Sequence, residues 1–208
     1  PVAIATPESY ADMLDRAKDG KYAIPAINVT SSQTLSAALK GFADAESDGI
    51  VQISNGGAAY WSGSSRLDRV AGSLAFASYA RAVGDLYPGI VGLHTDHCPK
   101  KFLECWIHPL LEIEADQVKR GELPVFQSHM WDGSAESLDD NIEIAVDMLK
   151  RSHAAHTVLE IEIGAVGGEE DGIKGEENAS LYTTADDAYR AIEALGLGEN
   201  GRYITALT

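Results

Sequence analysis

Histidine and carboxylate side chains are concentrated in four short segments of the sequence. These segments are GLHTDHCPKK (92–101), SHMWD (128–132), TVLEIEIG (157–164) and GAVGGEEDG (164–172). Imidazole and carboxylate groups ligate divalent metals and transfer protons near neutral pH. Each segment alone has an ordinary structural explanation, such as a hydrogen-bonded pair, a helix cap or a solvated loop. Their recurrence at the ends of successive predicted strands indicates one metal-assisted site.

The segment TVLEIEIG contains two acidic residues in an otherwise apolar run. Glu160 and Glu162 are two residues apart, so they share one face of a strand. A parallel strand that is covered on both faces is normally almost wholly apolar. Two adjacent carboxylates repel each other unless a cation or hydrogen-bond donors compensate. The pair therefore predicts a metal or acid–base role, and the alternative is the exposed face of an edge strand.

The two preceding segments place further polar groups at strand ends. Alternation puts His94 and Asp96 on one side of a strand, and His97 falls where that strand passes into a loop. The adjacent Asp96 and His97 could supply one metal ligand and one proton-transfer group, or they could form a hydrogen-bonded structural pair. We expect His129 and Asp132 at the same rim, although Asp132 could equally begin a turn.

Two glycine-containing segments complete this rim. Glu169 and Glu170 follow Gly167-Gly168, so a mobile loop could carry a general base inward, or its acidic tip could simply be solvated. The segment Ser54-Asn55-Gly56-Gly57 ends another predicted strand, and its backbone amides could approach an anion.

The elements that position these residues alternate between β and α patterns, which predicts an α/β fold with a parallel sheet. The strand candidates are Tyr22–Asn28, Ile50–Ser54, Ile90–Thr95, Pro124–Met130, Thr157–Gly164 and Tyr203–Leu207. Amphipathic helical patterns lie between them. Six such units in 208 residues fit an open doubly wound sheet by length alone, because a (β/α)8 barrel typically has about 250 residues.

Composition restricts the class of protein. With 16 basic and 32 acidic residues, the net charge of −16 disfavours binding to nucleic acid or anionic lipid. The sequence contains no apolar run of membrane-spanning length and no signal-peptide pattern at its start, so we expect a cytoplasmic protein. The two cysteines are too few for a disulfide scaffold, and we expect reduced thiols.

Five segments together resemble the class II, metal-dependent fructose-1,6-bisphosphate aldolases. They are AIPAIN, QISNGGAAY, HTDHCPKK, FQSHMWDGS and LEIEIGAVGGEEDG, in this order along nearly the whole chain. The resemblance implies a (β/α)8 TIM barrel, of which 208 residues would hold about the first six strands in one incomplete domain. It also implies a zinc ion with possible room for a second divalent ion, a homodimer, and reversible cleavage of the ketose bisphosphate into dihydroxyacetone phosphate and glyceraldehyde 3-phosphate in glycolysis and gluconeogenesis.

The resemblance also implies roles for individual residues. His97 would ligate zinc, with Glu162 and Asp132 close to the metal. Asp96 would exchange a proton with the C4 hydroxyl of the sugar. Glu170, with Glu169 beside it, would be the base for the dihydroxyacetone phosphate carbon. Ser54 would contact a substrate phosphate, and Asn28 would be a neighbouring substrate contact.

Members of the family continue beyond the sixth strand with glycine-rich segments that hold two further zinc histidines, and the sequence stops before them. We therefore expect the 208 residues alone to be inactive, to bind zinc weakly and to leave the outer edges of the first and sixth strands unpaired. The alternatives are an aldolase for tagatose 1,6-bisphosphate or a non-catalytic fragment. A Schiff-base mechanism is disfavoured because the lysines fall in predicted helices or loops.

Overall fold

The computed structural model describes residues 4–164, 168–170, 173–175 and 182–207, and for 168–170 and 173–175 it describes the backbone. The main sheet of this part of the chain is formed by β1 (Ala26–Asn28), β2 (Gly49–Ser54), β3 (Val91–Pro99), β4 (Ser128–Asp132), β5 (Val158–Ile163) and β8 (Tyr203–Leu207). All neighbouring pairs are parallel, in the order β1-β2-β3-β4-β5-β8. A doubly wound sheet reverses its strand order, whereas a (β/α)8 barrel does not. The order is therefore that of six barrel strands, and the length-based preference for an open doubly wound sheet is wrong.

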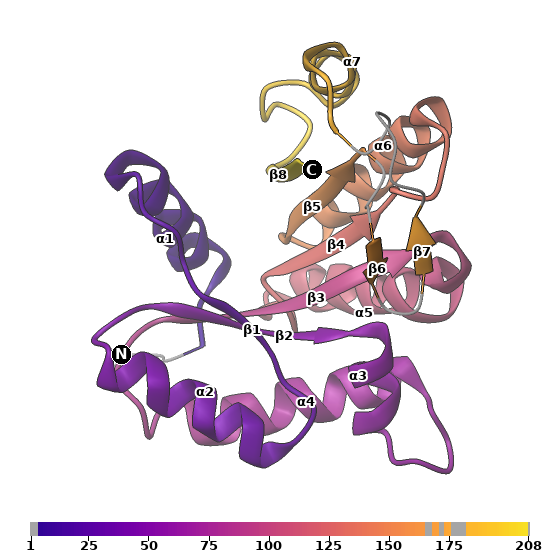
Figure 1. Ribbon diagram of the computed structural model, residues 1–208. Helices are drawn as coiled ribbons and strands as arrows, with labels where there is room; N and C mark the ends of the chain where they lie inside the picture. The colour runs from indigo at the N-terminus through magenta and orange to yellow at the C-terminus, as the bar shows by residue number, and fades with distance from the viewer. Residues whose placement is uncertain (1–3, 165–167, 171–172, 176–181, 208) are drawn as a thin grey trace.

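Helices cover the outer face of the sheet. They are α2 (Ser32–Asp44), α3 (Asn55–Trp61), α4 (Arg69–Gly84), α5 (His108–Lys119), α6 (Leu138–Ala154) and α7 (Ala185–Leu195). Figure 1 shows α2 and α4 along one side of the sheet, with α1 (Pro7–Gly20) on the other. Strand residues such as Leu93, Trp131 and Ile161 are fully buried in the core between sheet and helices. This core fixes which strand residues face the barrel interior.

Helix α1 packs on the inner face of the sheet. Its residues Tyr10 and Met13 are buried against Val158 and the surrounding apolar side chains of the inner face. The ring of Tyr10 lies over Gly92, where a Cβ atom would come within 2.4 Å of Tyr10 Cε2. Only glycine at position 92 leaves room for this ring. Helix α1 thus fills the N-terminal end of the barrel interior.

The helix ends follow the local sequence signals. Thr6 and Ser9 form a capping box before α1, and Pro7 occupies its first turn. Thr184 and Asp187 form the same arrangement before α7. Helix α1 ends at Gly20 as predicted, but the left-handed residue after it is Lys21, with φ 55°. Pro109, which the sequence left inside a helical stretch, lies in the first turn of α5 after the π-helical turn Leu103–Ile107.

Several predicted boundaries are corrected by backbone hydrogen bonding. Strand β1 begins at Ala26 rather than Tyr22, directly after Pro25, which has no N–H to donate to a ladder. Strand β4 begins at Ser128 rather than Pro124. The carbonyls of Pro124 and Val125 instead accept hydrogen bonds from the Arg81 side chain, at 2.8 and 2.7 Å. Strand β3 also continues past Thr95 to Pro99.

The predicted loop after β5 contains regular structure. Strands β6 (Gly168–Glu170) and β7 (Ile173–Gly175) pair antiparallel as a separate two-stranded sheet. At the edges of the main sheet, β1 pairs with β2 only and β8 with β5 only among the described strands. These are the two unpaired edges that the sequence predicted.

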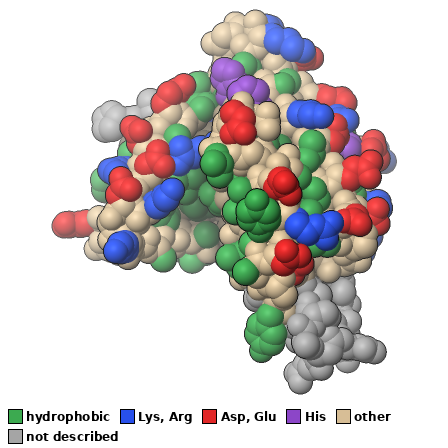
Figure 2. All heavy atoms as spheres, turned by 90° about the horizontal axis from the view of Figure 1, so that it is seen from above, with side chains coloured by type: hydrophobic (Ala, Val, Ile, Leu, Met, Phe, Trp, Pro, Cys, Tyr) green, Lys and Arg blue, Asp and Glu red, His purple; other side chains and the backbone are tan. Residues whose placement is uncertain are grey.

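The surface carries charges of both signs. Acidic and basic side chains are interspersed over the face that Figure 2 shows, with apolar side chains between them. None of the helices in the described part of the chain has the length and apolar character needed to cross a bilayer.

Candidate metal centre

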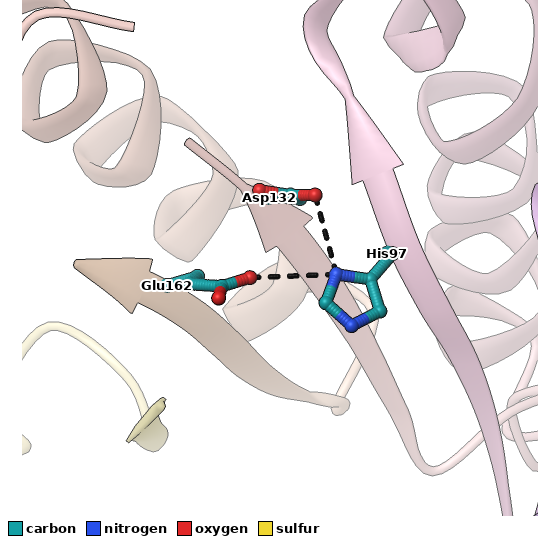
Figure 3. A group of neighbouring side chains, drawn as sticks. All are labelled: His97, Asp132 and Glu162. Carbon is teal, nitrogen blue, oxygen red and sulfur yellow. Dashed lines mark hydrogen bonds and ion pairs between the residues drawn. The ribbon is translucent and has the colours of Figure 1, made fainter. Parts of the chain in front are cut away.

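Three side chains from adjacent strands converge at the C-terminal ends of β3, β4 and β5. His97 Nδ1 lies 3.2 Å from Asp132 Oδ2 and 3.4 Å from Glu162 Oε2. One potential ligand atom from each residue lies within 4.8 Å of the other two. Figure 3 shows the two carboxylates directed at the same edge of the imidazole ring. One histidine and two carboxylates form a donor set suited to zinc.

Strand register explains the position of the two carboxylates. Asp132 is paired with Glu162 across β4 and β5, and both side chains emerge on the inner face. Strand β5 lies between β4 and β8 rather than at an edge. Glu162 is only 3% exposed. The alternative explanation of Glu160 and Glu162 as the exposed face of an edge strand is therefore wrong.

A β-bulge explains the position of His97. The register of β3 against β4 shifts between Thr95 and Cys98, where β3 contains one more residue than its partner. His97 has φ 41°, in the left-handed region that non-glycine residues rarely adopt. Regular alternation would point Asp96 and His97 to opposite faces. The extra residue brings both to the inner rim, where Asp96 Oδ1 and His97 Nε2 are 3.9 Å apart. The sequence predicted a loop at His97, and the structure has a bulged strand instead.

The electrostatics of the group favour a cation. The hydrogen bond with Asp132, followed by that with Glu162, raises the pKa of His97 to about 11. For Asp132, burial works to raise the pKa, but hydrogen bonds from His97 and Ser134 outweigh it and the net shift is downward. Glu162 Oε2 is buried, and its contact among the described residues is His97 Nδ1 at 3.4 Å. Such an oxygen beside a second carboxylate is suited to a metal ion, so the residues fit the zinc that the sequence implied.

Asp96 is held beside this group from β1. Asn28 Nδ2 donates to Asp96 Oδ2 at 2.8 Å. Ser54 is the register partner of Asp96 in β2, and its hydroxyl accepts a hydrogen bond from Gly57 N as the N-cap of α3. The structure thus places Asn28, Ser54 and Asp96 at the same rim as the candidate ligands.

Below this rim, the barrel interior contains a second pair of ionisable groups. His94 Nε2 lies 3.3 Å from Glu160 Oε2. Burial, and then the nearby His129, lower the pKa of His94 to about 3. Burial, and then the nearby Asp96, raise the pKa of Glu160 to about 7. His94 Nδ1 also lies 2.8 Å from Ser128 Oγ, which is in turn 2.8 Å from the Tyr10 hydroxyl. A buried polar chain therefore links α1 to the carboxylate below Asp96.

One sequence expectation, for His129, is wrong, and another, for Glu169 and Glu170, concerns side chains outside the described residues. His129 does not reach the rim, because its side chain faces the helix layer, where Nε2 lies 2.8 Å from Glu114 Oε2 and Nδ1 lies 2.8 Å from Thr95 Oγ1. His129 and Glu114 are both 0% exposed. The backbone of Glu169 and Glu170 belongs to β6, but their side chains, together with residue Asp171, lie outside what the structure describes.

Several residues around the site were not found by sequence reasoning. Tyr10 and Glu114 lie on helices far from the site in sequence, and Ser128 and Thr95 are ordinary strand residues. Glu114 occupies an inward position in a helix that otherwise buries leucines, so a charged residue on the apolar face was the available signal.

Comparison with known proteins is consistent with this geometry. The chain matches the family described as fructose-bisphosphate aldolase class-II over residues 8–207. It is 60% identical over 203 residues to the fructose-bisphosphate aldolase of Streptomyces coelicolor, covering 98% of this chain and 59% of that protein. The corresponding protein of Corynebacterium glutamicum is 55% identical over 205 residues, with 99% and 60% covered.

A solved structure agrees as well. The crystal structure of the Campylobacter jejuni fructose-bisphosphate aldolase superposes with a TM-score of 0.84 at 33% identity, covering 99% of this chain and 59% of that one. The chain therefore spans about three fifths of the length of these relatives. A match over residues 8–207 and this superposition lead to one conclusion: the chain belongs to the class II fructose-bisphosphate aldolase family.

Proposed function

We propose that the protein containing these 208 residues is a zinc-dependent lyase that reversibly cleaves fructose 1,6-bisphosphate into dihydroxyacetone phosphate and glyceraldehyde 3-phosphate. The observation that carries the proposal is the convergence of His97, Asp132 and Glu162 beside Asp96, in a chain of this family. Sugar phosphates are the substrate class that family membership supports. We further propose that the enzyme is a cytoplasmic homodimer of glycolysis and gluconeogenesis.

His97, Asp132 and Glu162 would hold the metal ion. When bound, zinc would act as a Lewis acid that polarises the ketose carbonyl and stabilises the negative charge that develops on the substrate oxygen. The relatives are longer than this chain, so we propose that other parts of the whole protein supply further ligands.

The acid–base work falls to carboxylates of this chain. In the cleavage direction, Asp96 accepts the proton of the C4 hydroxyl, the C3–C4 bond breaks, and C4 leaves as the aldehyde. The electron pair of that bond remains on the dihydroxyacetone phosphate part, whose C3 receives a proton from Glu170, with Glu169 next to it. The amide of Asn28 holds Asp96 Oδ2, which orients the carboxylate before the substrate arrives. Ser54 contacts a substrate phosphate in this scheme.

Metal removal and one matched pair of variants test the proposal. Exhaustive chelation of the full-length protein should abolish cleavage of fructose 1,6-bisphosphate, and added zinc should restore it. Asp96→Asn should lower kcat by at least about 100-fold, in the range of a lost general base. Asp116→Asn should leave kcat unchanged, because Asp116 is exposed on α5 and forms a surface ion pair with Lys119.

Four results would contradict the proposal or part of it. Full turnover after chelation would exclude a metal-dependent reaction, and trapping of substrate by borohydride would assign a lysine Schiff base instead. Faster cleavage of the C4 epimer, tagatose 1,6-bisphosphate, would retain the chemistry but replace the substrate. A full-length protein that binds zinc and cleaves neither sugar would be a non-catalytic member of the family.

A further inference from the structure

The bulge that presents His97 is preceded by two cross-strand hydrogen bonds, one on each face of the sheet. On the inner face, His94 of β3 is bonded to Ser128 of β4, and these two residues are register partners. On the outer face, the next register pair, Thr95 and His129, is joined in the same way. Both bonds measure 2.8 Å. The register shift begins immediately after them.

The outer bond is anchored further into the helix layer. Glu114 of α5 accepts two hydrogen bonds. Its Oε2 accepts from His129 Nε2 at 2.8 Å, and its Oε1 accepts from the backbone N–H of Phe126 at 2.7 Å. Thr95, His129 and Glu114 are each 0% exposed. The ring of Phe126 also contacts His129, with the ring centroids 5.3 Å apart. These contacts fix His129 from several directions, so it can act as a rigid partner for Thr95.

A bulge is held in place by the last regular pairs beside it, because an extra residue could otherwise be taken up at a neighbouring position of the strand. Moving the bulge by one residue would return Asp96 and His97 to opposite faces. It would also release His97 from its left-handed conformation, which costs of order 1–3 kcal/mol to maintain. Two directional bonds at consecutive pairs oppose this slip, one on each face.

We propose that Thr95 is a positioning residue that, through His129 and Glu114, confines the bulge to Asp96 and His97 and so directs the His97 ring at Asp132 and Glu162. Thr95 touches neither the candidate ligands nor the substrate in this scheme. It acts through the backbone of the two residues that follow it. The inference rests on the proposed function, in that His97 is taken as a metal ligand.

The test compares the zinc dissociation constant of three variants of the full-length protein, measured with a competing chelator. Thr95→Val keeps the shape of the side chain and removes the hydroxyl, whereas Thr95→Ser keeps the hydroxyl. We expect Thr95→Val to weaken zinc binding about 10-fold, at the lower end of the range for residues that support metal ligands. Thr95→Ser should remain close to the unaltered protein.

Ser73→Ala is the matched control. It removes a buried hydrogen bond, from Trp106 Nε1 to Ser73 Oγ at 2.9 Å, away from the bulge. It should lower the melting temperature as Thr95→Val does, without changing the affinity for zinc. The visible spectrum of the cobalt-substituted protein, which reports the geometry of the ligands, should change for Thr95→Val alone. Glu114→Gln removes the charge that holds His129 and leaves Thr95 unchanged, and it serves in place of Thr95→Val if that variant does not fold.

Each outcome supports or overturns the inference. Equal zinc affinity and an equal cobalt spectrum in Thr95→Val and the unaltered protein would overturn it. Equal weakening by Thr95→Val and Ser73→Ala would also overturn it, since the effect would then be one of general stability. If the unaltered full-length protein does not bind zinc, the proposed function and this inference both fail. The other two outcomes overturn the inference alone.

Discussion

Replacing Gly92 by alanine should disturb the packing of α1 against the sheet. The new methyl group would meet the Tyr10 ring at 2.4 and 2.8 Å, whereas ordinary carbon contacts begin near 3.4 Å. Strand β3 is paired on both sides, with β2 and β4, so the ring has to move by about 1 Å rather than the strand. Inserting a methyl group into a packed core costs about 1–3 kcal/mol. Loss of the bond between Tyr10 and Ser128 adds about 1 kcal/mol.

The free energy of unfolding should therefore fall by about 2–4 kcal/mol in Gly92→Ala, measured by urea unfolding of the full-length protein. Gly41→Ala is the control, because a Cβ atom at Gly41 in α2 has no neighbour within 4 Å. That change should raise the free energy of unfolding by about 0.5–1 kcal/mol, through the lower conformational entropy of the unfolded chain and the better helix propensity of alanine.

A double-mutant cycle tests whether the Tyr10 ring is the group that the new methyl group meets. In a Tyr10→Leu background the aromatic ring is absent, so Gly92→Ala should cost less than about 1 kcal/mol there. If the cost is the same in both backgrounds, the ring of Tyr10 is not what the methyl group meets, and the reasoning fails. A Gly92→Ala variant as stable as the unaltered protein would refute it directly.

Three further predictions concern the rim. Asn28→Ala should lower kcat about 10-fold with little effect on stability, because it removes the 2.8 Å bond that orients Asp96, and steady-state kinetics beside urea unfolding would check both parts. Glu162→Gln should weaken zinc binding in a chelator competition, and an unchanged dissociation constant would remove Glu162 from the ligand set. Zinc affinity should rise about tenfold per pH unit around neutrality, because the bonds to Asp132 and Glu162 raise the pKa of His97 to about 11 and zinc must displace that proton. Calorimetric titrations in buffers of different ionisation enthalpy should show one proton released per zinc bound, and zero release would contradict the assignment.

Much of the rim could be predicted because the relevant signals are local. The two-residue spacing of Glu160 and Glu162 correctly placed both on one face of β5, which is the inner face, and the strand-end position of Asp132 brought it to Glu162. The resemblance, rather than length, supplied the sequential strand order. The placement of the carboxylates needed only strand alternation and the parallel direction of the strands.

The remainder depends on contacts between distant residues. The strand-end position of the segment 128–132 placed His129 at the rim with Asp132, but the two are three residues apart in the regular strand β4, so His129 faces the helix layer and Glu114. A bulge leaves no mark in the sequence at Asp96 or His97, because neither residue is a glycine. The late start of β4 likewise results from Arg81, 43 positions before the carbonyl of Pro124 that it binds.

The order of the strands bears on when the candidate ligand group can form during folding. His97, Asp132 and Glu162 come from β3, β4 and β5, three consecutive neighbours in the interior of the sheet. Their arrangement needs only the pairing of residues between Val91 and Ile163, and neither sheet edge takes part. A nascent chain could therefore assemble this half of the metal site on the ribosome, well before the last strands of a barrel have been synthesised.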